Sequence, residues 1–341
     1  TQQTVLLEMS TRRTRLTRIF EYLITIWVIL TLNFLLPRLM PGDPFLYLGA
    51  DEGQDIAAFS QKQRAYYREY YGLDRPLSEQ YLAYLGALCR ADLGTSLYYG
   101  GSVGSIIAKR LPWTLFLVLS ATLFSALGGL VLGGISAMRR DSVLDKLLFT
   151  ASVMLSSIPS FLVGLVLLFL FAAGLRWFPL SGGVTAFTGS QPLLYRLTDL
   201  GKHATLPIAA LTVVRTAQMT LLARNSTITI LAQAYMQTAR AKGLKPARIL
   251  VQHALRNAFP PVFTRVFLSL GSLVGGAILV ENIFAYPGLG RLMREAVTVH
   301  DYPMLQGIFL VVTFFVLGAN WLADLLYPKL DPRLTGNGKQ A

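Results

Sequence analysis

The sequence predicts an all-α membrane protein whose single domain crosses the bilayer six times. Its 341 residues are 53% hydrophobic and only 14% charged, whereas about a quarter of the residues in a soluble domain are charged. Apolar runs of about 20 residues, the length that a helix needs to cross roughly 30 Å of hydrocarbon, recur along the chain. The alternating strands of about ten residues that build a transmembrane β-barrel do not occur.

Six segments have the length and composition of membrane-spanning helices. They are residues 20–39, 112–138, 147–175, 204–223, 262–283 and 304–327. We therefore divide the chain into an N-terminal segment (1–19), a six-span domain (20–327) and a C-terminal tail (328–341). The domain contains a large outer loop at about 40–111 and a loop on the opposite side at about 224–261.

The distribution of basic residues predicts the orientation of the spans. The net charge is +13, and if the N-terminus is cytosolic, sixteen Lys and Arg fall in short cytosolic segments. The outer side then carries twelve, seven of them in one long loop beside eight acids, and long loops count little in the positive-inside rule. Both termini are therefore expected in the cytosol. Orientation in the membrane therefore accounts for the excess of basic residues, and binding to nucleic acid is not needed to explain it.

The outer loop contains a predicted amphipathic helix. Tyr81, Tyr84, Leu85 and Leu88 recur at helical spacing, which is typical of a short helix lying on or near a membrane. After this loop, Pro112 is expected in the first turn of the second span, where the missing N–H costs nothing.

Small residues and prolines mark particular spans. Gly129 and Gly133 in the second span, and Gly271 and Gly275 in the fifth, are pairs four residues apart that allow helix backbones to approach closely in lipid. Pro159 lies inside the third span. We interpret it as a tolerated kink, and the alternative is a hinge or opened turn beside a pathway.

Arg215 lies near the middle of the fourth span, where an ionised side chain is costly and should face the bundle interior or a water-filled cavity. Arg215 could either pair with another residue of the protein or contact the substrate, and the sequence leaves both roles open. Glu281 is a tempting partner, but it falls near the outer end of the fifth span, so the two are expected to differ in depth. Depth and chemistry make Arg215, Gln218 and Met219 the candidate residues of a translocation path.

A basic hairpin is predicted between the fourth and fifth spans. Residues 226–242 are expected to form one helix that Gly243 ends, as glycine commonly does. A second helix begins with Pro246 in its first turn and runs toward Asn257, before Pro260. The hairpin is thus a structured projection. We considered a plain positive-inside loop, a DNA-reading helix-turn-helix and a docking site for a soluble partner, in which a cationic rim sets the register. Short flanks tether both helices to the membrane, which argues against DNA binding.

The motif QTARAKGL (237–244), followed by HALRNAFPP (253–261), resembles the cytoplasmic EAA loop of bacterial ABC importer permeases, in the dipeptide, oligopeptide and nickel branch. The general pattern is Glu-Ala-Ala, three residues and then Gly. Here Gln237 replaces the glutamate, while Thr-Ala-Arg-Ala-Lys-Gly-Leu is the form that this branch uses. Other motifs resemble family landmarks in family order: PGDP (41–44), YGLDRPLSEQY (71–81), DLGTS (92–96), RLPWTL (110–115), SSIPSFLVG (156–164), ENIFAYPGLGRL (281–292), DYPMLQG (301–307) and LDPR (330–333).

The resemblance implies a type I ABC importer permease fold in the bacterial inner membrane, as the first, B-type permease of a pair. Its expected partners are a second homologous permease, two ABC ATPase subunits that bind ATP and Mg²⁺, and an external solute-binding protein. The outer loop would form part of the landing surface for that protein. Ala239, Ala241 and Leu244 would supply contact area to an ATPase, with Arg240 and Lys242 at the rim. The implied ATPase-coupling residues are Gln237, Thr238, Ala239, Arg240, Ala241, Lys242, Gly243 and Leu244.

The chain has few features of an enzyme. It contains no G-x-x-x-x-G-K-[ST] phosphate loop, no H-E-x-x-H and no C-x-x-C, so we expect it to hydrolyse no ATP, to bind no cofactor and to hold no metal. Cys89 is the only cysteine, which excludes a disulfide within these residues. A secondary transporter or channel is the main alternative, but we find no duplicated half with matching broken helices. A membrane-anchored scaffold leaves Arg215 unexplained. The solute class stays open among dipeptides, oligopeptides, peptide-like molecules and nickel or its chelates.

Overall fold

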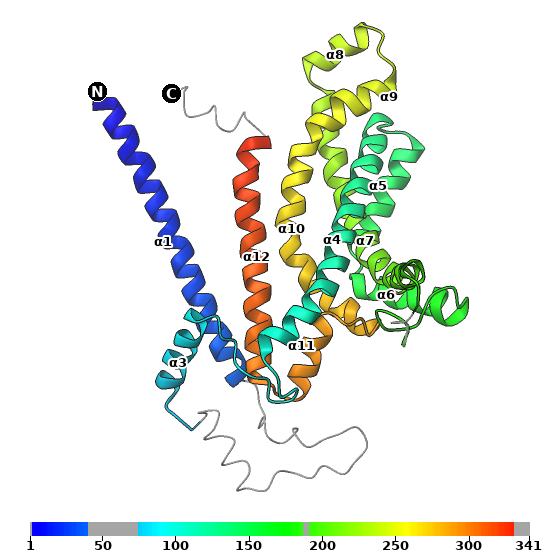
Figure 1. The fold of residues 1–341 in the computed structure, drawn as a ribbon. Coiled ribbons are helices and arrows are strands. Elements are labelled where there is room, and N and C mark those ends of the chain that lie inside the picture. Colours follow the sequence, from blue (N-terminus) through cyan, green and yellow to red (C-terminus); the bar gives the residue numbers. More distant parts are fainter. Residues whose placement is uncertain (1, 40–73, 187–190, 331–341) are drawn as a thin grey trace. The chain divides into compact units, whose positions relative to one another are not determined.

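The computed structural model of the chain describes residues 2–39, 74–186 and 191–330 (Figure 1). In these ranges the ordered elements are helices, joined by turns and one isolated bridge between Thr95 and Ser102. Some predictions fall outside the described residues. They concern the PGDP motif, the first half of the outer loop and most of the C-terminal tail with its LDPR motif.

Five of the predicted spans lie within single helices. They are α1 (Gln2–Leu39), α4 (Val103–Met138), α7 (Leu193–Leu231), α10 (Arg256–Ile283) and α12 (Tyr302–Leu330). The third is divided among α5 (Val143–Ser156), α6 (Ser160–Leu167) and the π-helical segment η2 (Leu168–Gly174). Between the spans lie α3 (Leu77–Cys89), α8 (Ala234–Ala241), α9 (Pro246–Arg248), the π-helical segment η4 (Ile249–Leu255) and α11 (Leu289–Thr298).

By length and hydropathy, four of the described helices are able to cross a membrane, or five if the bent pair around Pro159 is one span. The predicted fifth span, 262–283, is helical in α10 but is not among these. The second span begins earlier than predicted. Because α4 starts at Val103, Pro112 lies inside the helix and not in its first turn.

The chain forms two compact units. Unit 1 comprises Thr1–Ile107 and Glu295–Thr313, and unit 2 comprises Ala108–Arg294 and Phe314–Ala341.

In unit 1, the aromatic face of α3 packs on α1. The Tyr81 and Tyr84 rings lie 5.2 and 5.6 Å from the Phe34 ring, between centroids. The Tyr81 hydroxyl hydrogen-bonds Thr31 at 2.7 Å, and the Asn33 amide donates to the Tyr84 hydroxyl at 3.1 Å. The predicted helix is confirmed, and its apolar face covers another helix of the same chain.

Asp301 joins two of the sequence motifs in unit 1. Its carboxylate accepts hydrogen bonds from the Ser96 hydroxyl (2.5 Å), the Tyr98 backbone N–H (3.2 Å) and the Met304 backbone N–H (3.1 Å). The Met304 bond satisfies an N–H at the start of α12, as an N-terminal cap does. The DLGTS loop is therefore fixed to the beginning of the last span.

In unit 2, α4 and α7 approach closely through glycine. A Cβ at Gly133 would lie 2.6 Å from the Thr220 carbonyl oxygen and 2.7 Å from the Arg224 backbone nitrogen. Gly129 faces Met219 in the same way. This pair therefore makes the predicted close contact, whereas Gly275 meets no atom within 4 Å among the described residues.

Gly133→Ala is expected to destabilise the protein by about 1–3 kcal/mol, because the new methyl group forces the α4 and α7 backbones apart. Thermal unfolding of the detergent-solubilised protein measures this effect. Gly275→Ala is the matched control, since its methyl group enters open space. Equal unfolding temperatures for the two variants would contradict the close α4–α7 approach.

The third span is broken at Pro159. The helices α5 and α6–η2 meet at 99°, and Pro159 caps the start of α6 with extended backbone (φ −59, ψ 137). Proline has no N–H with which to continue the α5 hydrogen-bond ladder. The interpretation as a tolerated kink is therefore wrong, and the opened turn describes this segment.

Candidate functional site

The basic hairpin, residues 234–258, lies beyond the ends of α4 and α5 (Figure 1). Its first limb is α8, which is separate from α7 because α7 ends at Leu231. The predicted single helix 226–242 is therefore wrong. The break allows α8 to fold back, so that Met236 is fully buried in an apolar cluster with Ile249 and Ala254.

The turn of the hairpin has the predicted glycine. Gly243 adopts φ +72, a left-handed conformation that glycine accepts readily. Its N–H donates to the Arg240 carbonyl at 2.9 Å. Pro246 then occupies the first turn of α9, as predicted. The second limb does not stop before Pro260: η4 leads directly into α10, which contains that proline.

The predicted coupling residues divide between an inner and an outer face of the hairpin. Ala239 is only 8% exposed, and the half-buried Leu244 packs against the Met236 cluster. These two support the turn from within, so Ala239 offers little area to a partner. The exposed residues are Gln237, Thr238, Arg240, Ala241, Lys242 and Gly243.

An ion pair ties the last part of α7 to α5. Arg224 donates from Nε and Nη2 to the two Asp145 carboxylate oxygens, each at 2.7 Å. The Ser136 hydroxyl and the Asp141 backbone N–H also donate to Asp145. The two side chains are 16% and 3% exposed, and the Arg224 guanidinium lies 5.1 Å from the centre of the Phe149 ring. This pair joins the ends of three helices next to the hairpin.

The arginine pocket is a cavity of about 450 Å³ beside the broken third span. The turn Ser156–Ser160 forms one wall, and α7 and α10 contribute Arg215, Gln218 and Arg265. The prediction that Arg215 faces a cavity is confirmed. Met219 does not line this pocket, because it is buried against Ala223 and Val262. The remaining lining residues are Leu211, Val214 and Gly276.

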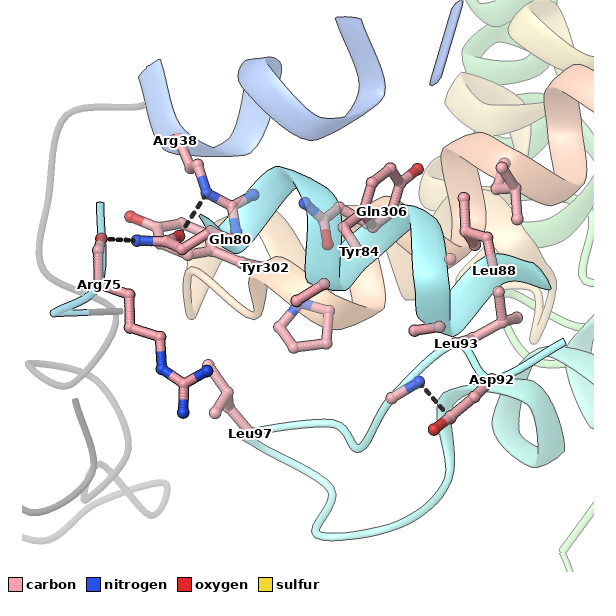
Figure 2. A pocket seen from close by; sticks show the side chains of 16 residues that line it. Arg38, Arg75, Gln80, Tyr84, Leu88, Asp92, Leu93, Leu97, Tyr302 and Gln306 are labelled. Atoms are coloured by element: carbon pink, nitrogen blue, oxygen red, sulfur yellow. Dashed lines mark hydrogen bonds between the residues drawn. The ribbon is translucent and has the colours of Figure 1, made fainter. Parts of the chain in front are cut away.

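A second cavity, of about 370 Å³, lies in unit 1 beside α3 (Figure 2). Arg38 donates to the Gln80 side-chain oxygen at 3.0 Å, and Gln80 donates to the Arg75 carbonyl at 2.8 Å (Figure 2). Tyr84 also lines this α3 pocket, and burial raises the pKa of its phenol. The walls thus combine cationic and amide groups with the apolar residues Leu88, Leu93, Leu97 and Leu310.

Glu281 does not pair with Arg215, in line with their predicted difference in depth. It is fully buried and accepts hydrogen bonds from the Thr114 hydroxyl and the Gly290 N–H, each at 2.6 Å. A carboxylate in this position satisfies N–H groups at the start of α11. A Cβ at Gly288 would collide with the carboxylate, which explains why glycines follow Tyr-Pro in this motif.

Three of these arrangements were not predicted from the sequence. Asp145 and Arg224 lie at the ends of two predicted spans and carry opposite charges, a signal from which their pairing could have been predicted. Arg265 lies near the start of the predicted fifth span, and nothing in the sequence assigns it to a pocket with Arg215. For Glu281, Arg215 was the only partner considered. The structure instead places the Thr114 hydroxyl within hydrogen-bond distance of its carboxylate.

Comparison with known proteins identifies the class of this chain. Residues 129–336 match the family described as "Binding-protein-dependent transport system inner membrane component". The di/tripeptide transport system permease protein DppB of Pseudomonas aeruginosa is 37% identical over 324 residues, covering 91% of this chain and 95% of that protein. The oligopeptide transport system permease protein AppB of Bacillus subtilis is 35% identical over 304 residues, covering 89% and 93%.

A solved structure supports the fold. The inward-facing MetNI methionine ABC transporter matches with a TM-score of 0.53 and 16% identity, covering 66% of this chain and 96% of that chain. At this identity the likeness concerns the fold alone, and it agrees with the all-helical type I importer permease architecture. With the family match and the two relatives, these observations show that the chain belongs to the inner membrane components of binding-protein-dependent transport systems.

Proposed function

We propose that the chain is the transmembrane permease subunit of an ATP-driven peptide importer in a bacterial inner membrane. The observation that carries the proposal is the compact basic hairpin between α7 and α10, in a chain that resembles a di/tripeptide permease over 91% of its length. The chain itself is non-catalytic. ATP and Mg²⁺ bind to two partner ATPase subunits, and a second homologous permease completes the translocation path.

In this arrangement both termini are cytosolic, and the basic hairpin docks on one ATPase subunit. Arg240 and Lys242 are exposed at its tip, where cations set the register of docking and raise the association rate. The buried cluster around Met236 keeps the tip rigid. A motion of the ATPase is therefore transmitted as a displacement of α7 and α10 and is not absorbed by bending of the turn.

The path from the hairpin to the substrate runs along packed helices. The helix α7 packs against α5, α6 and α10, and the Asp145–Arg224 pair fixes it to α5. Farther along, α7 and α10 carry Arg215, Gln218 and Arg265 of the arginine pocket. A shift of these helices changes the shape of the pocket. We therefore assign Arg215 and Gln218, which line it, to the translocation path.

In this proposal the α3 pocket lies on the outer side of the membrane, because α3 belongs to the predicted outer loop. It is lined by Arg38, Arg75, Asp92 and amide side chains (Figure 2). A mixed polar and apolar surface of this kind suits the rim of a protein interface. We assign it to the landing surface for the external solute-binding protein.

The proposal is tested by coexpressing the chain with its second permease, the ATPases and the binding protein. The expected result is copurification of both ATPases, and uptake of a labelled dipeptide or tripeptide into proteoliposomes that requires ATP and the binding protein. Uptake that proceeds without ATP would contradict the proposal and favour a secondary transporter. A complex that assembles but transports no peptide would leave the permease class intact and exclude the peptide substrate.

A further inference from the structure

We propose that the arginine pocket binds the carboxylate group of a peptide as the peptide crosses the membrane. This inference rests on the proposed transport function and adds the chemical group that the path recognises. Its basis is the convergence of three elements on one cavity: the broken third span, the middle of α7 and the adjacent part of α10.

Two guanidinium groups give the pocket its charge. Arg215 from α7 and Arg265 from α10 both line the cavity, and their positive charges repel each other. The described lining contains no Asp or Glu. An anion that enters between two like charges relieves their repulsion, and guanidinium groups bind carboxylates through paired hydrogen bonds.

The remaining walls include two groups, the Ser160 hydroxyl and the Gln218 amide, that can donate hydrogen bonds to a carboxylate. Ser156, Ser157, Ser160 and Gln218 line the cavity. The hydroxyls of Ser156 and Ser157 donate to the Val153 carbonyl, at 2.9 and 3.0 Å. These bonds use the hydroxyl hydrogens of Ser156 and Ser157 at the end of α5, so the two side chains shape the wall. Ser160 and Gln218 are left to donate to the carboxylate. Polar side chains at fixed positions around a charged group are typical of small-ligand sites.

The break at Pro159 adds the N-terminus of α6 to the same cavity. This helix begins at Ser160, which lines the pocket, and no side-chain hydrogen bond caps it. The positive end of a helix attracts anions. Transporters use the ends of interrupted membrane helices in this way to bind anionic groups of their substrates. The N-terminus of α6 at the opened turn thus attracts the same negatively charged group as the two arginines.

The size and charge of the cavity limit the ligand. About 450 Å³ lies within the range of roughly 300–1,000 Å³ for small-molecule sites, so it holds the end of a peptide and not a long peptide. The terminal carboxylate is common to peptides of any side-chain sequence. A site for this group therefore tolerates different side chains, while two arginines repel a bare metal cation such as nickel.

The test compares a short peptide with its C-terminal amide in the reconstituted complex with its binding protein. The variants are Arg215→Gln and Arg265→Gln, and both peptides are used at saturating binding-protein concentration. Each variant is expected to slow transport of the free-carboxylate peptide by roughly tenfold or more, the usual effect of losing a charged hydrogen bond. Transport of the amide should change less than about twofold, because the amide carries no negative charge for these groups to bind.

Arg196→Gln is the matched control, since Arg196 is an exposed arginine on the same helix, outside the pocket. It should leave the ratio of the two rates unchanged. Arg215→Lys keeps the charge and should recover part of the loss. Amide transport by each variant also reports whether the complex has folded and assembled.

Equal effects on both peptides, or no effect on either, would overturn the carboxylate site while leaving the peptide importer standing. Failure of the wild-type complex to transport any peptide is a different result. It would reject the proposed function, and the carboxylate site with it.

Discussion

Gly243→Pro is expected to reduce copurification of the ATPase subunits with the permease by more than about tenfold, the effect of losing a central interface contact. Gly243 has φ +72 and donates its N–H to the Arg240 carbonyl. Proline fixes φ near −65° and has no N–H, so the turn cannot keep its shape. The exposed residues Arg240 and Lys242 then lose their relative positions.

The measurement is the ratio of ATPase to permease after affinity purification, followed by peptide-stimulated ATP hydrolysis. Gly243→Asn is the matched control, because asparagine tolerates the left-handed conformation and a Cβ at this position meets no atom within 4 Å. It should retain most of the copurified ATPase. If the proline variant binds the ATPases and transports peptide like the wild type, the basic hairpin is not the coupling element.

Arg224→Ala is expected to lower the stability of the protein by about 3–5 kcal/mol, because it leaves the buried Asp145 carboxylate without its charged partner. Two 2.7 Å hydrogen bonds are lost, and the remaining donors to Asp145 are Ser136 and the Asp141 N–H. We expect a lower unfolding temperature of the detergent-solubilised protein and a lower yield in the membrane.

The neighbouring pair Arg140–Asp141 offers a control in the same part of the chain. Its atoms are 3.6 Å apart and its side chains are 61% and 83% exposed, so Arg140→Ala should cost no more than about 1 kcal/mol. Replacing both members of the buried pair with apolar residues should be less harmful than Arg224→Ala alone. Similar unfolding temperatures for Arg224→Ala and Arg140→Ala would show that the ion pair does not support the fold.

The sequence correctly predicts helices at five of the six proposed spans because the signal for them is local. Apolar runs of sufficient length must be helical in a membrane, where each backbone polar group needs an internal partner. The turn at Gly243 and the start at Pro246 were also predictable, since each depends on the conformation of one residue type. The pair Gly129 and Gly133 was predicted for the same reason, although only the structure identifies α7 as the neighbouring helix.

The errors come from interactions between distant segments. The helix 226–242 breaks after Leu231, and this break accompanies the burial of Met236 against residues that follow the turn. Periodicity within the segment carries no information on that contact. In the same way, the membership of Arg265 in the arginine pocket and the exclusion of Met219 depend on how α7 and α10 are rotated against each other. Helix rotation is set by packing and not by local composition.

The π-helical segment η4 determines the angular phase between the basic hairpin and α10. A π-helical turn contains an additional residue compared with an α-helical turn and arises as an insertion within an α-helix. Since one α-helical residue corresponds to about 100° of rotation, rewinding the same seven residues of Ile249–Leu255 as an α-helix would turn the hairpin tip around the α10 axis by roughly that angle. The direction in which Arg240 and Lys242 face thus depends on whether this segment is wound as a π-helix or as an α-helix.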